Sequence, residues 1–382
     1  MPDPATPFTF ATAGQIQFGR GVSDKMVEIA SGFGKRVLLV HGASGRGVDR
    51  TLRDCADHDV EVSRIACGRE PDLDMLTMAL AEARPARPDC VLSLGGGSVI
   101  DLGKALAALL PATGDVLDHL EVVGQGLRLT ADPLPFIAVP TTAGTGAEVT
   151  RNAVIGVPEH RRKVSLRDAR MLADVALVDP ALTDNAPRAL TLASGLDAVT
   201  QVIEPYLCNR TNPLTDALCR DAIPRGLGAL NRLMRGEDET ARDDMALTSL
   251  YGGLALANVG LGAVHGLAGV IGGMAPGAPH GAICGALLPH VLTANAAAVP
   301  AGSDTARRIA EVQGWITRHL NLDHIGAFPD WTRRNGLPGL AAMGVRSGDH
   351  AAIAKAAQTS SSMKANPALL SEQVLQDILA AA

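Results

Sequence analysis

Short apolar runs alternate with helix-like segments in the first half of the chain. Residues 36–40, 90–94 and 136–139 are mostly apolar and are bounded by Gly, Pro or charged residues, which predicts strands, and residues 176–178 form a shorter candidate. Residues 77–86, between the first two runs, have the spacing of an amphipathic helix. Apolar strands separated by helices are typical of a parallel sheet covered on both faces. We therefore expect an α/β fold.

After Asp179-Pro180 the pattern changes to Ala- and Leu-rich helical periodicity without a convincing strand. Helices are expected at residues 189–208, 213–232, 243–257, 260–272 and 306–319. The sequence thus predicts an α/β domain of residues 1–185 followed by an all-helical domain of residues 186–382.

One long stretch of the helical half carries no charge. Residues 245–303 contain no Asp, Glu, Lys or Arg, and residues 249–273 are long enough to span a bilayer. Eight glycines, Asn258 and His265 lie in the latter segment, and it lacks the flanking Lys/Arg bias of a membrane span. We expect buried core helices here, and no membrane partner.

Composition narrows the function classes. With 382 residues, 47% of them hydrophobic and 19% charged, the chain is not intrinsically disordered. A net charge of −6 and an aromatic content of 3% argue against a nucleic-acid partner. The six cysteines form no CxxC pair and are expected to be reduced, and the N-terminus lacks the features of a signal peptide. These observations predict a cytoplasmic protein.

A glycine turn follows the apolar run at residues 90–94. Gly95, Gly96 and Gly97 precede Ser98, and residues 99–110 have helical periodicity. Residues without side chains let a diphosphate approach the backbone, where the helix N-terminus offers N–H groups. Ser98 is the expected N-cap. A turn without a ligand would need one glycine, so three favour a ligand, although the motif is neither GxGxxG nor a P-loop.

The next predicted strand leads into a second polar loop, which contains Thr141, Thr142 and Thr145. Loops at strand ends of open α/β sheets collect at one edge, where ligands bind. The threonine hydroxyls therefore suit phosphate or ribose, but a solvated loop without a ligand remains an alternative.

The helical half holds a candidate metal site. Asp197 and Gln201 are four residues apart and share one helical face, and His265 and His280 lie in the uncharged region. A carboxylate and two imidazoles suit Fe or Zn. A single histidine is better explained as a hydrogen-bonded core residue. His290 is a third candidate, for which we expect a structural role or a role in supporting a ligand. Two histidines with a carboxylate make a metal site a competitive interpretation.

Taken together, these motifs resemble the iron-containing (group III) alcohol dehydrogenases. The matching segments are Gly95–Asp101, Pro140–Thr150, Asp174–Thr183, Gly195–Tyr206, His265-Gly266 and Pro279–Gly281, in family order. The resemblance implies a Rossmann-like N-terminal domain that holds NAD(P)(H) and an all-α C-terminal domain that holds Fe²⁺ or Zn²⁺, in a dehydroquinate synthase-like architecture. It also implies an active site in the cleft between them and reversible hydride transfer between a small alcohol and its aldehyde or ketone.

The resemblance assigns residues to roles. Asp197, His265 and His280 would be catalytic, because they would hold the metal that polarises the substrate oxygen, with Gln201 at the position of a further ligand. The residues that the resemblance and its motifs place at the cofactor are Gly95, Gly96, Gly97, Ser98, Asp101, Thr141, Thr142, Thr145, Lys163, Gly42 and Ser44. Apolar helical faces make a homodimer the expected assembly.

Three positions depart from the family pattern. Gln201 stands where the family usually has a third metal-binding histidine, and a neutral amide is the poorer ligand. Gly269 stands where a further histidine is common, so a proton-relay role is missing or supplied elsewhere. Many NAD-preferring members carry Asp after the second strand, where this chain has residues 41–46 without a carboxylate. Nothing there repels a 2′-phosphate, and Ser44 or Arg46 could bind one, which predicts tolerance of NADP(H).

Three alternatives remain at this point. A maleylacetate-reductase-like enzyme reduces a C=C bond without metal, but such relatives tend to lose the carboxylate that is Asp197 here. A dehydroquinate-synthase-like lyase needs a more polar substrate site than the second half provides. A non-enzymatic cofactor-binding relative is supported by Gln201, whereas the glycine turn and both histidines argue against it.

Overall fold

The computed structural model describes residues 7–382, which form two compact units. The sheet unit contains residues 12–142 and 146–183. Of the described residues, the helical unit contains residues 184–382, Ala143–Thr145 and residues 7–11. The domain limits 1–185 and 186–382 stay a prediction, and the compact units differ from them in these two short segments.

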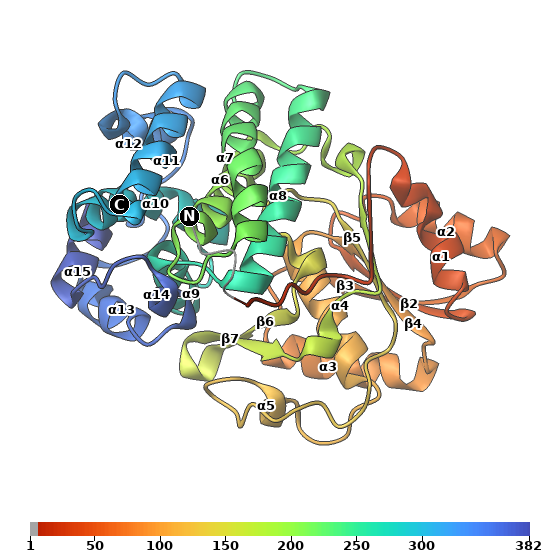
Figure 1. Ribbon diagram of the computed structural model, residues 1–382. Helices are drawn as coiled ribbons and strands as arrows, with labels where there is room; N and C mark the ends of the chain where they lie inside the picture. The colour runs from red at the N-terminus through yellow and green to blue at the C-terminus, as the bar shows by residue number, and fades with distance from the viewer. Residues whose placement is uncertain (1–6) are drawn as a thin grey trace. The chain divides into compact units, whose positions relative to one another are not determined.

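The sheet unit is built on six parallel strands in the order β1-β8-β5-β4-β2-β3 (Figure 1). The strands are β1 Gln15–Phe18, β2 Arg36–Gly42, β3 Glu61–Cys67, β4 Cys90–Gly95, β5 Phe136–Pro140 and β8 Val175–Val178, and β6 Asn152–Val157 pairs with β7 Arg162–Arg167 in a separate antiparallel hairpin. The four predicted strands are confirmed as β2, β4, β5 and β8. The edge strands β1 and β3 and the hairpin were not predicted, because exposed positions interrupt their apolar runs.

Helices cover both faces of this sheet. The helices of the unit are α1 Met26–Ser31, α2 Val48–Asp57, α3 Leu73–Ala83, α4 Gly97–Leu109 and α5 Val116–His119. Leu39 and Leu92 pack with α1 and α2 on one face. Side chains alternate along a strand, so Ser93 points to the other face, where α4 lies. A Cβ at Gly103 of α4 would stand 1.8 Å from Ser93 Oγ, so only glycine lets α4 pack this closely. The predicted α/β fold is confirmed.

The helical unit contains no strand within residues 184–382, all of which the structure describes. Its helices are α6 Arg188–Leu207, α7 Pro213–Leu233, α8 Glu239–Val259, α9 Ala263–Met274, α10 His280–Ala298, α11 Asp304–Leu320, α12 Phe328–Arg334, α13 His350–Ala357, α14 Ser361–Ala365 and α15 Glu372–Ala381. α6, α7 and α8 pack side by side, and α10 packs on α6, around one apolar core (Figure 1). The predicted helices are therefore confirmed.

The uncharged stretch forms core helices of this unit. α8 and α9 are bent by 95° at the break between them, and as a pair they meet the length and hydropathy expected of a membrane span. α10 meets the same test alone, and 67% of its most apolar window is buried inside the unit. A helix that is apolar all round fits the interior of a large domain.

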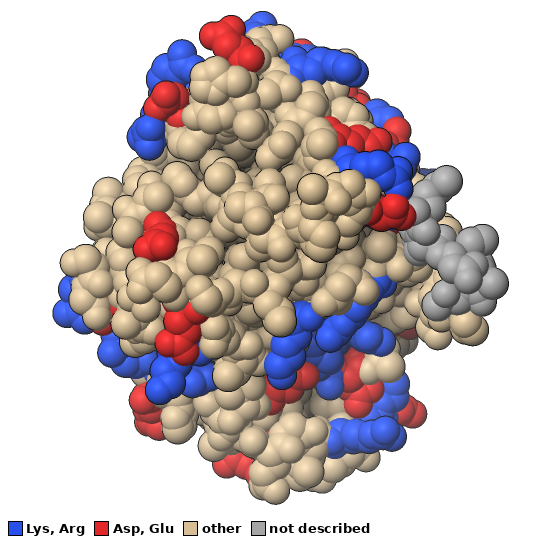
Figure 2. All heavy atoms as spheres, turned by 60° about the vertical axis from the view of Figure 1, so that its left-hand side comes forward, with Lys and Arg blue, Asp and Glu red and all other residues tan. Residues whose placement is uncertain are grey.

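Charge is sparse on the face drawn in Figure 2. Lys and Arg side chains are interspersed there with Asp and Glu, and much of the middle of that face is uncharged. This distribution agrees with the charged content of 19% and the net charge of −6. The absence of a nucleic-acid partner stays a prediction.

A buried lysine ties α4 to the segment that follows β5. Lys104 Nζ donates to the carbonyls of Ala147 (2.7 Å) and Asn152 (3.0 Å) and to Thr150 Oγ1 (2.9 Å). Its burial lowers its pKa to about 8. Glu148 is also buried in this segment, and its burial raises its pKa to about 7. In both groups, burial therefore makes the charged form less favourable in the folded state.

The raised pKa of Glu148 makes stability depend on pH. Between its ordinary value of 4.5 and about 7, the folded state binds more protons at this carboxyl than the unfolded state. The contribution of this group to the free energy of unfolding therefore falls as pH rises through that window. Glu148→Gln removes the effect, and should be more stable than the natural chain by up to about 3 kcal/mol above about pH 7.

Urea unfolding at about pH 5 and about pH 8 measures this difference. The control is Glu159→Gln, which removes an exposed carboxyl group of the same unit. A Glu148→Gln stability difference that does not grow between the two pH values would contradict the prediction.

Candidate functional site

The predicted cofactor loops lie at neighbouring strand ends of the sheet unit. β2 pairs with β3 on one side and with β4 on the other, so the strand order reverses between β2 and β4. Ligands of open α/β sheets bind at the carboxyl ends of the strands at such a point. Gly42 and Ser44 stand at the end of β2, Gly95–Ser98 at the end of β4, and Thr141 follows β5.

The glycine turn is tightly packed. A Cβ at Gly95 would stand 2.4 Å from Val99 Cγ2, and one at Gly96 would stand 3.2 Å from Thr142 Oγ1. α4 begins at Gly97, and Gly96 is its N-cap without a side-chain hydrogen bond. The expectation that Ser98 caps the helix is wrong, because Ser98 is the second residue inside it. A glycine cap leaves the first N–H groups of α4 without a side-chain acceptor, which suits an anion.

Other predicted cofactor residues already have protein partners. Asp101 Oδ2 accepts the N–H of Val154 (3.1 Å), and Lys163 on β7 forms an ion pair with Glu70. Arg46 Nη1 donates to the carbonyl of Leu182 (2.7 Å). These contacts lie within the sheet unit. The cofactor roles of these residues stay predictions.

The helical unit brings four possible metal ligands together. One ligand atom each from Asp197, His265, His280 and Cys284 lies within 4.8 Å of all the others. Asp197 Oδ1 is 3.4 Å from His265 Nε2 and 3.9 Å from His280 Nε2, and Cys284 Sγ is 3.7 Å from His280 Nε2. The structure thus assembles the three predicted ligands, and adds a cysteine that the sequence analysis missed.

Two glycines make this convergence possible. A Cβ at Gly281 of α10 would stand 2.2 Å from the carbonyl oxygen of Ala193 on α6, and one at Gly285 would stand 2.5 Å from Leu196 Cδ1. α10 therefore rests almost directly on α6. His280 and Cys284 each precede one of these glycines and are one helical turn apart, so the close packing carries both towards α6.

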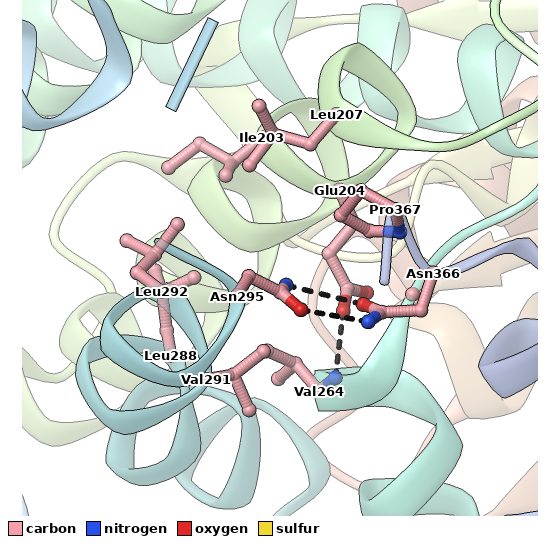
Figure 3. Close-up of a pocket in the computed structure, with 11 residues that line it drawn as sticks. Ile203, Glu204, Leu207, Val264, Leu288, Val291, Leu292, Asn295, Asn366 and Pro367 are labelled. Carbon is pink, nitrogen blue, oxygen red and sulfur yellow. Dashed lines mark hydrogen bonds between the residues drawn. The ribbon is translucent and has the colours of Figure 1, made fainter. Parts of the chain in front are cut away.

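A carboxylate from α6 orients His265. Glu204 Oε2 is 2.6 Å from His265 Nδ1. Glu204 Oε1 accepts the N–H of Val264 (2.7 Å) at the start of α9, as Figure 3 shows. An ionised carboxylate only accepts, so it keeps a proton on Nδ1, and in the neutral imidazole the lone pair is then on Nε2, where a metal ion would bind. The same group satisfies a donor at the N-terminus of α9, where negative charge is favourable. The sequence analysis did not single out Glu204.

An asparagine pair supports the same helix end. Asn366 Oδ1 accepts the N–H of Ala263 (3.1 Å), and the amides of Asn366 and Asn295 are bonded to each other (Figure 3). These groups line a small pocket next to Glu204, whose other walls are apolar residues such as Ile203 and Val291. The start of α9, and with it His265, is held in place from two directions.

The electrostatics of the four-residue group favour a cation. Burial lowers the pKa of His265, but Cys284, Asp197 and Glu204 together raise it well above its ordinary value. The pKa of His280 rises to about 9, chiefly through Cys284. Burial raises the pKa of Asp197, but His280 and His265 outweigh this and lower it. The site therefore stabilises positive charge.

Two atoms of the group lack hydrogen-bond partners. Within residues 7–382, Asp197 Oδ1 and His265 Nε2 are among three buried side-chain atoms without one, although their side chains are only 4% and 7% exposed. A buried polar atom without a partner is costly. Both atoms point at the same place, and a divalent cation there would satisfy both, so these residues fit a metal ion.

Gln201 and Gly269, two positions that depart from the family pattern, differ in their contacts. Gln201 is buried on α6, and its Nε2 donates to the carbonyl of Thr145 (2.6 Å). The backbone of Thr145 is thus hydrogen-bonded to α6, within the helical unit. Gly269 lies one turn after His265 on α9, and no atom lies within 4 Å of where its Cβ would stand. Ligation by Gln201 stays a prediction.

Comparison with known proteins decides the family. The model of the iron-containing alcohol dehydrogenases matches residues 13–180, and that of the C-terminal part of the Fe-containing alcohol dehydrogenase family matches residues 191–382. The chain belongs to the iron-containing alcohol dehydrogenase family. The resemblance predicted from the motifs is confirmed.

Individual relatives agree with this assignment. A 4-hydroxybutyrate dehydrogenase of Cupriavidus necator is 37% identical over 72% of each chain, and a 1,3-propanediol dehydrogenase of Klebsiella pneumoniae is 34% identical over 90% of each. The solved structure of a 1,3-propanediol oxidoreductase is 29% identical, with a TM-score of 0.86 over 98% of this chain and 99% of that one.

Membership establishes the activity. The protein is an oxidoreductase that acts on CH–OH donors and interconverts an alcohol with its carbonyl compound. Its cofactors are NAD(P)(H) and a divalent metal ion. This outcome favours the dehydrogenase over the three alternatives that the sequence left open.

Glu204→Gln tests how much the enzyme depends on the carboxylate beside His265. The amide keeps one acceptor, but its nitrogen opposes the N–H donors at the start of α9. Loss of such a partner should lower metal affinity about 10–100-fold. Competition with a chelator measures the affinity.

Glu311→Gln is the matched control, since Glu311 accepts a hydrogen bond from Tyr206 in the same unit and is outside the metal group. The control should bind metal as the natural enzyme does. Unchanged affinity in Glu204→Gln would show that His265 is oriented without it.

Proposed function

We propose that Asp197, His265 and His280 hold the metal ion, and that the Gly95–Ser98 turn, with the loops after β2 and β5, holds NAD(P)(H). The observation that carries the metal assignment is the convergence of Asp197 Oδ1 and His265 Nε2, both buried and without hydrogen-bond partners. When bound, the metal supplies Lewis-acid polarisation of the substrate oxygen, and the nicotinamide supplies the hydride chemistry.

The protein residues around the proposed metal ion have separate roles. Asp197 contributes the negative charge, and Glu204 keeps the proton of His265 on Nδ1. Burial of Asp197 and His265 excludes water from one side of the group, which strengthens its electrostatic interactions. His280 is 30% exposed, so its side of the group is the one that a substrate reaches.

The proposed substrate is a short alcohol with a second polar group, or the corresponding aldehyde. Relatives that are 34–37% identical are named for 1,3-propanediol and 4-hydroxybutyrate. Gly269 leaves space beside His265 on α9, at the place where family members commonly carry a histidine. A cytoplasmic location, a homodimer and the absence of a membrane partner stay predictions.

Elemental analysis of anaerobically purified enzyme tests the metal assignment. We expect near-stoichiometric Fe or Zn in the natural chain. In His265→Ala and in Asp197→Asn the metal should be lost, and kcat should fall at least about 100-fold, because several kcal/mol of charge stabilisation disappear.

His290→Ala is the control on the same helix as His280, and it should keep both metal and turnover. Metal-free natural enzyme that still oxidises NAD(P)H would overturn the assignment and support a metal-independent reductase.

We further propose that the enzyme accepts NADP(H) as well as NAD(H). Ser44 stands in the turn after β2, where no carboxylate follows the strand. Ser44→Asp introduces the missing charge, which repels a 2′-phosphate. The KM for NADP(H) should rise at least about tenfold, as like charges in close contact cost more than 1.4 kcal/mol, while that for NAD(H) changes little.

Steady-state kinetics with both cofactors measures this split, and Ser44→Asn is the uncharged control. Equal changes for the two cofactors would place the 2′-phosphate elsewhere.

A further inference from the structure

The strongest unassigned feature of the helical unit is the buried thiol of Cys284. It lies one helical turn after His280 on α10, is fully buried, and has its Sγ 3.7 Å from His280 Nε2. Its Sγ is within 4.8 Å of a carboxylate oxygen of Asp197 and of a ring nitrogen of His265. The role proposed for the three predicted ligands makes no use of it.

We propose that Cys284 is a direct ligand of the metal ion, so that this enzyme holds its metal with one Asp, two His and one Cys. The inference rests on the metal assignment proposed above. It keeps the number of protein ligands at four, although Gln201 replaces a histidine. Binding forms a metal–thiolate bond and breaks the S–H bond, whose proton passes to solvent.

The separations of the ligand atoms support this assignment. Zn–N bonds of about 2.1 Å and Zn–S bonds of about 2.3 Å in a tetrahedron place neighbouring ligand atoms about 3.3–3.7 Å apart. The observed separations are 3.4 Å for Asp197–His265, 3.9 Å for Asp197–His280 and 3.7 Å for His280–Cys284. The separation of Cys284 from His280 is thus that of two ligands of one ion, and Sγ also lies within 4.8 Å of the ligand atoms of Asp197 and His265.

Two unpartnered atoms point to a ligand at this place, and helix packing holds the thiol beside them. Asp197 Oδ1 and His265 Nε2 are more than nine-tenths buried, lack hydrogen-bond partners and face the group. Gly285, which follows Cys284, packs against Leu196 on α6, the neighbour of Asp197. The packing of α10 on α6 therefore holds the thiol beside the carboxylate.

The donor set has a chemical consequence. A thiolate is a softer ligand than imidazole or an amide oxygen and favours Zn²⁺ over Fe²⁺. The preference of the enzyme for Zn²⁺ over Fe²⁺ should therefore be larger than that of a variant without the thiol.

Cobalt substitution tests the bond directly. The full-length enzyme loaded with Co²⁺ should show the near-ultraviolet sulfur-to-cobalt charge-transfer band, and Cys284→Ser should lose it. Cys219→Ala, which removes another fully buried thiol of the same unit, should keep the band. Since loss of a residue that merely supports a ligand lowers metal affinity about 10–100-fold, loss of Cys284 should lower it at least about tenfold.

A rescue experiment distinguishes ligation from packing. Gln201→His in the Cys284→Ser background restores the ligand set usual in the family, and should restore Co²⁺ affinity without restoring the charge-transfer band. The ratio of Zn²⁺ to Fe²⁺ affinity should fall in Cys284→Ser. If Cys284→Ser does not fold, Cys284→Ala and the spectrum of the natural enzyme still decide.

Natural enzyme that binds Co²⁺ without a sulfur band, or a Cys284→Ser variant that keeps the band, overturns the proposal and leaves the Asp197–His265–His280 assignment standing. Natural enzyme that binds no metal overturns both.

Discussion

The carboxylate of Glu204 is the constraint on which the metal group depends. It lies on α6, as Asp197 does, and bonds at once to the Nδ1 of His265 and to the backbone at the start of α9. One charged group therefore fixes the position of the helix, the tautomer of the imidazole and the direction of its Nε2. The N-terminus of α9 stabilises the negative charge of the carboxylate. The stability of α9 and the orientation of the His265 imidazole therefore depend on the same group.

Close helix packing supplies the second part of the arrangement. Gly281 and Gly285 bring α10 onto α6 at distances that no side chain would permit. The need for close packing also explains why residues 245–303 carry no charge. By length and hydropathy alone, helices of this region are compatible with a membrane span. Helices that pack on all sides need small and apolar residues, and the few polar groups among them, such as His265 and Asn295, are held by specific partners.

Much of the fold could be predicted from the sequence, because buried central strands and long helices leave strong patterns. β2, β4 and β5 are runs of mostly buried, mostly apolar residues. β3 lies at the edge of the sheet, has only two buried positions, and was missed. The error at Ser98 has a local cause. A serine before a helical pattern is a common cap, but the close approach of the turn to Val99 and Thr142 moves the helix start back to Gly97.

The site was predictable only where a spacing or a family motif marked it. Asp197, His265 and His280 stood out as polar residues in an apolar region, and the structure brings them together. Cys284 carried one usable signal, its position one turn after His280, and Glu204 carried one as well, two turns after Asp197 on the same face of α6. Neither signal is specific without the packing of α10 and α9 on α6, since any long helix contains many residues at such spacings.

Gln201 connects α6 to the segment that follows β5. Its amide nitrogen donates to the carbonyl of Thr145, and the backbone of Gly144 lies against Ser194, so residues 143–145 belong to the helical unit although they follow β5. Thr142, just before this segment, and Glu148, three residues after it, belong to the sheet unit. There Thr142 contacts Gly96, and Lys104 donates to the carbonyl of Ala147, next to Glu148. At the position where the family usually has a metal-binding histidine, the amide nitrogen of Gln201 is thus bonded to a backbone carbonyl. Cys284 on α10, the ligand proposed above, keeps the number of protein ligands at four.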